Sequence, residues 1–371
     1  MIMSMRLKKL LALSLSVSLV STGIFVDVGM RSVTAAASKT KQAKDKKNVK
    51  KVKVTVAQKK TIKAPKSEKK AVWSILSGKQ NISVIKKGKG EIKIKAQKSG
   101  SVKLQAKQGK KKTIYNITVK KQAPKKSEIK QLTKFYKECF IKSSKEMGNN
   151  WYADGDDFLH DKWIEWDDYG YIRGMSLEAK EILTEINLPW FKKIQYFGSV
   201  TGNNLKSIDL GNNPTLKYFF LDVGYGESAE GNYPYLNKID FSGCQNLEGV
   251  YINSVFNIKQ IDLSNNRKIK TVNISHTPLD ELKMPKTDCL KEVYMNWSKI
   301  NELDLSNCTN IQKIGIIGCN PQSVTISLGN KTDKEISEFD IDVYSADVET
   351  SVRFVANREI SEGPKVRYEY G

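Results

Sequence analysis

The stretch Gln260-Ile261-Asp262-Leu263-Ser264-Asn265-Asn266 decides the fold of the C-terminal half of this chain, because the sequence repeats it. The same frame returns in Ser207–Asn213, Lys238–Cys244 and Glu302–Cys308, each time ending in Asn or Cys. A short apolar frame that recurs along a chain is typical of a solenoid, in which each turn buries its apolar side against the next turn. The repeats therefore predict one continuous, stacked core.

The spacing of the frame, apolar-x-x-apolar-x-apolar, is nearly constant. Each frame begins eleven positions after the one before it, except that two steps are one position shorter and the step from Leu216 to Leu236 contains an insertion around Gly224 to Pro234. The frames begin at Ile172, Leu183, Ile194, Leu205, Leu216, Leu236, Leu247, Ile258, Ile269, Leu279, Leu290, Ile300 and Ile311. This period predicts repeats over residues 171–330.

The frames alternate between two kinds, so the full repeat is 21 or 22 residues long. One kind carries Asp-Leu-Ser and ends in Asn or Cys, and the other is rich in aromatic and β-branched residues, as in Val250-Tyr251-Ile252. A buried Asn satisfies backbone groups at a bend, whereas a Cys fills the same space as a small apolar residue. We expect these positions to form a structural ladder of buried Asn side chains and reduced, buried Cys thiols, with redox or metal roles for the cysteines as the alternative. The ladder residues are Asn213, Cys244, Asn266, Cys308 and Cys319.

This alternation, with Cys among the Asn positions, resembles the cysteine-ladder branch of the internalins and related clostridial cell-surface proteins from residue 172 to about 326. The match weakens at Lys283-Met284-Pro285, where Asp-Leu-Ser is replaced. The resemblance implies a curved parallel-β leucine-rich-repeat solenoid that serves adhesion or partner recognition.

The segments on either side of the repeats have the composition of caps. Apolar residues recur at helical spacing from Ser127 to about Lys145, and Trp151, Trp163 and Trp166 follow. We expect residues 122–170 to be a linker and an N-terminal cap with one helix, because an open solenoid end needs cover. The alternating tail, residues 331–371, is expected to supply C-terminal cap strands.

Charge separates the chain into two parts. Residues 38–130 contain 31 Lys and four acidic residues, a local charge of 31 − 4 = +27, whereas residues 131–371 carry −8 of the total of +22. A polylysine surface attracts polyanions. We expect an anionic cell-wall polymer as the partner, with anionic lipid headgroups, extracellular DNA or a merely solvated surface as alternatives. A specific nucleic acid is not expected, because base recognition favours Arg and interleaved aromatic residues.

The lysine-rich segment also alternates apolar and charged residues over short runs separated by glycines, which predicts about seven strands and a β-sandwich. Trp73, Ile82-Ser83-Val84, Lys98–Ala106 and Ile117-Thr118-Val119 give residues 51–121 a resemblance to bacterial Ig-like domains of the invasin and intimin type. The resemblance implies a spacer or adhesive stalk. Residues 38–50, which are dense in Lys, are expected to be disordered.

The N-terminus has the pattern of an export signal. Arg6, Lys8 and Lys9 precede an apolar run, and Ala35, Ala36 and Ala37 fit a cleavage site, so residues 1–37 are predicted to be a signal peptide. An uncleaved membrane anchor is the alternative. After cleavage we expect no transmembrane segment, and we expect the protein to be secreted or held at the cell surface.

The candidate ligand-binding residues lie between the apolar positions of the aromatic kind of frame. Such residues point away from the core of a solenoid, and an exposed aromatic side chain combines apolar area with a polar tip. β-Propensity alone is the alternative reason for their presence. The candidates are Tyr218, Phe220, Tyr251, Asn253, Asn273, Tyr294 and Asn296.

Other kinds of site have less support in the sequence. Asp209, Asp240, Asp262 and Asp304 are expected to cap turns rather than to bind calcium. The segment Glu165–Ser176 resembles an EF-hand loop only in part, because it lacks the final Glu. We therefore expect no metal site and no cofactor.

Catalysis is not expected either. The chain has only two histidines, His160 and His276, and lacks a phosphate-binding glycine loop. A carboxylate-based glycan hydrolase using Asp156, Asp157, Asp167 or Asp168 stays the least favoured alternative. The sequence thus predicts a binding or adhesion protein that recognises an extracellular protein or glycan, with a structural spacer as the main rival.

Overall fold

A computed structural model describes residues 48–141, 164–179, 183–201, 205–223, 236–317, 323–331, 340–344, 351–356 and 365–369. The chain forms two compact units, and residues 166–171 belong with the N-terminal unit while residues 172–371 belong to the other. No helix among the described residues is both long enough and apolar enough to cross a membrane. The predicted signal peptide, residues 1–37, lies outside the described part of the chain.

The N-terminal unit is a β-sandwich of two sheets. One sheet has the order β1-β7-β6-β3 and the other the order β2-β5-β4, with β1 parallel to β7 and the other neighbouring strands antiparallel. The strands are β1 (Val49–Thr55), β2 (Lys59–Lys63), β3 (Val72–Ser77), β4 (Ile82–Gly88), β5 (Glu91–Ala96), β6 (Gly100–Gln108) and β7 (Lys111–Lys120). Val49 and Lys50 pair with β7, so the prediction of disorder is wrong for the end of residues 38–50.

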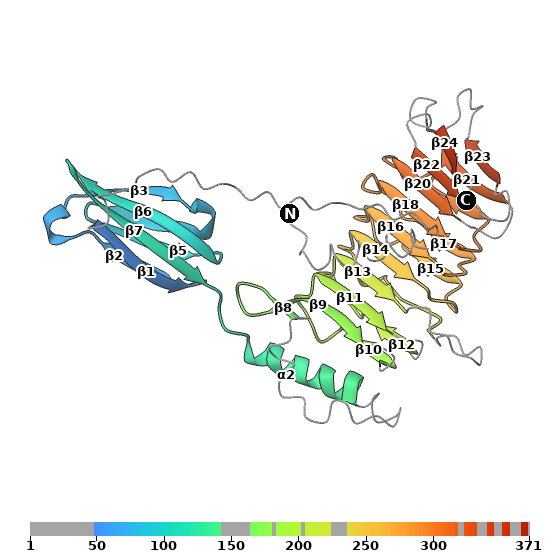
Figure 1. Ribbon diagram of the computed structural model, residues 1–371, viewed down its shortest axis with the longest axis horizontal. Coiled ribbons are helices and arrows are strands. Elements are labelled where there is room, and N and C mark those ends of the chain that lie inside the picture. Colours follow the sequence, from blue (N-terminus) through green and yellow to red (C-terminus); the bar gives the residue numbers. More distant parts are fainter. Residues whose placement is uncertain are drawn as a thin grey trace. The chain divides into compact units, whose positions relative to one another are not determined.

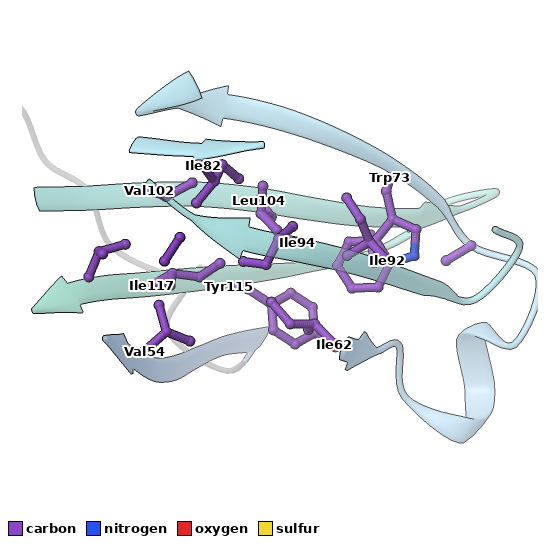
Figure 2. Packing of buried hydrophobic residues seen from close by; sticks show 14 of the residues in the cluster. Val54, Ile62, Trp73, Ile82, Ile92, Ile94, Val102, Leu104, Tyr115 and Ile117 are labelled. Atoms are coloured by element: carbon purple, nitrogen blue, oxygen red, sulfur yellow. The ribbon is translucent and has the colours of Figure 1, made fainter. Parts of the chain in front are cut away.

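The core of the sandwich lies between the two sheets, where alternate side chains of the strands meet (Figure 2). Trp73 from β3 packs against Tyr115 from β7 with ring centroids 5.1 Å apart. The Tyr115 hydroxyl donates to the Lys63 carbonyl at 2.8 Å, which satisfies its polar tip inside an apolar cluster. Burial raises the pKa of Tyr115, so this hydroxyl keeps its proton.

The segment after the last sandwich strand is tied to residues 166–171. Gln122 N donates to the Asp168 carbonyl at 3.0 Å, and Lys125 N donates to the Gly170 carbonyl at 2.8 Å. The Asp168 carboxylate in turn accepts hydrogen bonds from the amide and the hydroxyl of Ser99, both at 2.7 Å. Residues expected to be a plain linker therefore extend the sandwich unit.

The second unit is a parallel β-solenoid, seen in Figure 1 as a stack of strands that runs from β9 to β24. Its long-stranded sheet has the order β24-β22-β20-β18-β16-β14-β13-β11-β9-β8. The strands are β8 (Ile164–Trp166), β9 (Ile172–Ala179), β11 (Tyr196–Thr201), β13 (Tyr218–Asp222), β14 (Gly249–Asn253), β16 (Thr271–Ser275), β18 (Glu292–Asn296), β20 (Lys313–Ile317), β22 (Asp340–Tyr344) and β24 (Lys365–Glu369). A mainly β chain with a parallel sheet is confirmed.

The Asp-Leu-Ser kind of frame forms the opposite face of the solenoid as short parallel strands. These are β10 (Glu185–Asn187), β12 (Ser207–Asp209), β15 (Gln260–Asp262), β17 (Glu281–Lys283), β19 (Glu302–Asp304), β21 (Ser323–Gly329) and β23 (Ser351–Ala356). Between the two faces runs an aromatic stack in which the Phe197 and Phe219 rings are 6.0 Å apart and the Phe219 and Phe241 rings 5.3 Å apart. Each coil thus buries its apolar side chains on those of the next coil.

A helix precedes the repeats, as its apolar spacing indicates. α2 (Lys126–Phe135) continues into one π-helical turn, Tyr136–Ile141. Phe135 packs on Phe191 with ring centroids 5.6 Å apart, and Cys139 is fully buried, with its pKa raised to about 11 by burial. Trp151 and Trp163, the other expected cap residues, lie outside the described residues.

The tail does not close the solenoid as a separate cap but continues it. β22 and β24 extend the long-stranded sheet in parallel, and β23 extends the opposite face. Ile341 pairs in register with Ile314, and Val366 pairs with Ile341. The sequence intervals from Ile314 to Ile341 and from Ile341 to Val366 are both longer than the interval from Val293 to Ile314, the register pair of the preceding coil. The longer coils hide the repeat from a search at the spacing of the earlier frames.

Candidate binding face of the solenoid

The outward positions of the long-stranded sheet form three rows, because parallel strands in register align equivalent residues. The first row contains Gly174, Tyr196, Tyr218, Gly249, Thr271, Glu292 and Lys313. The third-position row contains Ser176, Gly198, Phe220, Tyr251, Asn273, Tyr294 and Gly315. The fifth-position row contains Asp222, Asn253, Ser275 and Asn296. Every candidate binding residue lies in one of these rows.

Tyrosine rings lie across glycines of adjacent strands on this face. A Cβ at Gly249 would stand 3.0 Å from Tyr218 Cδ1, and a Cβ at Gly315 would stand 2.6 Å from Tyr294 Cδ1. Tyr196 covers Gly174 in the same way and is hydrogen-bonded to Glu165. Because the register partner has no side chain, each ring can lie against the sheet rather than stand upright.

The phenols of Tyr218 and Tyr251 stay protonated at neutral pH. Burial raises the pKa of Tyr251 to about 12, although a hydrogen bond with Thr271 acts in the opposite direction. Burial and the neighbouring Glu248 raise the pKa of Tyr218. Both side chains therefore offer a hydroxyl that donates as well as accepts.

The expectation that Phe220 faces solvent is wrong, since only 2% of its surface is exposed. Phe220 lies in register between Gly198 and Tyr251. Because a glycine has no side chain, the apolar ring beside it has room to pack against the sheet, and burying the ring is favourable. Asn253, Asn273 and Asn296 occupy outward positions but are also buried, because the bulky neighbouring side chains cover them. The accessible candidates are Tyr218, Tyr251 and Tyr294, each partly exposed.

Two of the buried amides are joined to their neighbours by hydrogen bonds. Asn253 Nδ2 donates to Asp222 Oδ1 at 3.1 Å, and Asn253 Oδ1 lies 3.2 Å from His276 Nδ1. The Ser275 hydroxyl donates to Asn273 Oδ1 at 2.8 Å. These contacts fix the two amides beside the tyrosines.

The residue directly after each of three successive long strands adopts a left-handed backbone. Ser254, His276 and Trp297 have φ angles of 58°, 49° and 55°. This conformation costs about 1–2 kcal/mol for a residue with a Cβ. The backbone hydrogen bonding between coils nevertheless continues at these left-handed residues, since His276 N donates to the Asn296 carbonyl at 2.8 Å.

His276 and Trp297 form an aromatic pair that the sequence reasoning did not include in the site. Their rings are nearly parallel, at 12°, with centroids 5.7 Å apart, and 39% of Trp297 is exposed. Aligning the strand ends would have found the pair, because Ser254, His276 and Trp297 follow one another at the spacing of one full repeat.

A small charged cluster flanks the first row. Glu248 accepts from Lys217 Nζ at 2.6 Å and from Lys270 Nζ at 2.8 Å. Burial alone would raise the pKa of Glu248, but the hydrogen bonds and charges of Lys217 and Lys270 lower it to about 2. The three side chains link the coils of β13, β14 and β16.

The described Asn and Cys positions of the ladder are buried on the side of the solenoid that carries the short strands, opposite the long-stranded sheet. Asn266 Nδ2 donates to the carbonyls of Phe241 and Cys244 at 3.0 and 2.9 Å, and Asn213 Nδ2 reaches the Leu188 carbonyl at 3.4 Å. Cys244 and Cys308 are fully buried, and burial raises their pKa to about 12 and about 11. Cys319 lies outside the described residues.

Two further residues occupy this ladder and were missed because they are neither Asn nor Cys. Thr287, which bridges to Cys308, donates from its hydroxyl to the Arg267 carbonyl at 2.6 Å. The ammonium of Lys331 donates to the Leu305 carbonyl at 3.2 Å from a buried position. Polar side chains of different types thus donate to backbone carbonyls of the preceding coil at these positions.

The four frame aspartates cap turns. Asp209, Asp240, Asp262 and Asp304 each accept, through Oδ1, from the amide two residues later at 2.8–2.9 Å. Hydrogen bonds from Ser242 and Ser264 lower the pKa of Asp240 and Asp262. Within the described residues no group of three or more His, Cys, Asp or Glu side chains could hold a metal ion.

The EF-hand-like segment does not form such a loop. Glu165 belongs to β8 and Ile172–Ala179 is β9, so strands occupy most of it. Asp167 Oδ1 accepts from the amides of Tyr169 and Tyr171 at 2.8 and 2.9 Å, which is turn capping. Asp156 and Asp157, the other candidate carboxylates for hydrolysis, lie outside the described residues.

The sandwich presents a different surface. Every lysine from Lys50 to Lys121 is exposed. Several stand opposite one another across strand pairs, such as Lys59 and Lys95 or Lys86 and Lys93. Like charges in directly opposed positions are destabilising, and a bound polyanion would relieve that repulsion.

The repeats and their two faces define a parallel β-solenoid preceded by a β-sandwich. No protein-family model matches the chain, and no curated protein matches it. Among solved structures, the chain is similar to the functional domain of InlJ from Listeria monocytogenes, which includes a cysteine ladder, with 18% identity and a TM-score of 0.32. The match covers 40% of this chain and 35% of that structure.

Proposed function

We propose that this protein is an exported binding protein of the leucine-rich-repeat class that recognises an extracellular protein or glycan. The observation that carries the proposal is the set of partly exposed tyrosines, Tyr218, Tyr251 and Tyr294, held against the long-stranded sheet by glycines or by close neighbours. Aromatic side chains with a polar tip, fixed by the fold, bind partners at a small entropic cost. The role is binding rather than catalysis.

The lysine-rich sandwich, which we propose to be a bacterial Ig-like domain, would retain the protein at the cell surface by binding an anionic wall polymer. Its exposed lysines and their unfavourable cross-strand pairs support this assignment. Because such binding is electrostatic, it weakens as salt screens the charges. Purified teichoic acid should bind the full-length protein at low salt and release it at high salt, and binding without salt sensitivity would refute this role.

The recognition role is tested by affinity capture from an envelope fraction with the full-length protein. The double variant Tyr251→Ala/Tyr294→Ala should lose its partner, because both rings lie on the proposed face. The control Asn265→Ala removes an exposed side chain from the other face and should retain it. Equal capture by wild type and double variant would favour a structural spacer instead.

A further inference from the structure

The outward side chains of β14, β16 and β18 form an uncharged patch. Their third and fifth positions carry Tyr251, Asn253, Asn273, Ser275, Tyr294 and Asn296. Charge begins at the border, with Asp222 on β13, Glu292 at the start of β18 and Lys313 on β20, whose Nζ lies 5.7 Å from the centroid of the Tyr294 ring. In a chain with 27% charged residues, the partly exposed phenols of Tyr251 and Tyr294 beside these buried amides indicate a partner that brings hydroxyls rather than charges.

The aromatic pair lies at the end of the same strands. Trp297 takes up a strained left-handed backbone, stacks on His276 and leaves 39% of its surface exposed. A glycine would adopt this backbone without strain. A bulky aromatic side chain in such a position is explained when the ring itself contacts a ligand.

The pair is connected to the amides and is itself neutral. His276 stacks on Trp297 and its Nδ1 lies 3.2 Å from Asn253 Oδ1. Burial lowers the pKa of His276 from its ordinary value of 6.5, which keeps the ring uncharged at neutral pH. The patch and the pair therefore form one surface whose charged residues lie at its border.

On these grounds, and resting on the proposed recognition role of this face, we propose that Tyr251, His276, Tyr294 and Trp297 bind a neutral polysaccharide. A pyranose ring has an apolar C–H face that packs on aromatic rings and hydroxyls that pair with phenol and imidazole groups. Successive coils are about 4.8 Å apart, close to the length of one sugar residue, so a linear chain can place consecutive sugars on consecutive coils. An anionic polymer would meet the carboxylates of Asp222 and Glu292 at the border of this patch, as well as the ammonium of Lys313.

The test measures binding of the full-length protein to hexamers of β-1,4-glucose, β-1,3-glucose, β-1,4-xylose, β-1,4-mannose and β-1,4-N-acetylglucosamine. Wild type should bind at least one hexamer, and the affinity should not change between about 0.05 and about 0.5 M NaCl. Trp297→Gly should weaken binding by about 10-fold or more. Its unfolding midpoint should stay close to that of wild type, because the relief of the strained φ offsets part of the stacking on His276 that is lost.

The matched control is Ser254→Gly, which makes the same backbone change two coils earlier without removing an aromatic ring, and it should keep the wild-type affinity. The proposal is overturned if no hexamer binds, or if Trp297→Gly binds as wild type does. If the protein then still captures an envelope protein in a Tyr251- and Tyr294-dependent manner, the recognition role stands and only the polysaccharide assignment fails.

Discussion

The sandwich closes its core between two sheets, whereas the solenoid buries each coil against the next. In the sandwich, many outward strand positions carry lysine, and the surface becomes a nearly uniform cation. In the solenoid, register aligns equivalent residues into rows, so that tyrosines and amides gather on one part of the face and charged residues lie at its border. Strand topology therefore decides whether side chains of one kind spread over a whole surface or gather in rows on one face.

The largest expected loss of unfolding free energy comes from removing one buried aromatic ring in either core. Phe219→Ala removes the middle ring of the solenoid stack and should cost about 3–5 kcal/mol of unfolding free energy. Trp73→Ala should cost a similar amount in the sandwich. Hydrogen exchange should show lost protection only in the unit that carries the change, and loss in both units from either variant would contradict separate cores.

The ladder should respond according to residue type. Asn266→Ala leaves the carbonyls of Phe241 and Cys244 without their buried donor, which should cost about 2–3 kcal/mol. Cys244→Ala, at the same position one coil earlier, removes only apolar contacts and should cost about 1 kcal/mol. Urea unfolding of both variants measures this difference, and equal losses would show that the amide is not a structural donor.

The Lys217–Glu248–Lys270 cluster should make the solenoid sensitive to acid. Folding lowers the pKa of Glu248 to about 2, against about 4.3 in an unfolded chain. The stabilisation is therefore complete above about pH 4.3 and is lost as the pH falls toward 2. Unfolding free energies at several pH values should place Glu248→Gln about 2 kcal/mol below wild type at pH 7. The gap should close at low pH, and a constant gap would contradict this pKa.

The smallest effect concerns salt and should distinguish the two surfaces. Screening reduces the repulsion between opposed lysines such as Lys86 and Lys93, so about 0.5 M NaCl should stabilise the sandwich by up to about 1 kcal/mol. The solenoid, whose Lys217 and Lys270 pair with Glu248, should gain nothing. Region-resolved hydrogen exchange at two salt concentrations tests this, and equal stabilisation of both units would refute it.

The repeat frame predicted the coils up to Ile311 because apolar spacing reports directly on burial. It missed β22 to β24 as further coils, since these coils are longer, and it missed Thr287 and Lys331 in the ladder, since any donor of the right reach serves there. Strand alternation placed Phe220 at an outward position but could not show that a neighbouring glycine lets the ring lie flat and become buried.

The candidate site was predicted only in outline for a related reason. Tyr251 and Tyr294 followed from alternation, but the His276–Trp297 pair depends on a left-handed backbone at the strand end. Left-handed positions are usually marked by Gly or Asn, and here Ser, His and Trp occupy them. Only stacking the coils in space makes their common geometry visible.

The most direct test of the account is the capture of envelope material by the full-length protein at about 0.05 and about 0.5 M NaCl, for wild type and for Tyr251→Ala/Tyr294→Ala. We predict that high salt removes the material held by the sandwich and leaves a salt-resistant fraction on wild type. That fraction should be absent from the double variant. If high salt removes all binding from wild type, or if the double variant keeps the resistant fraction, the solenoid face is not the recognition surface.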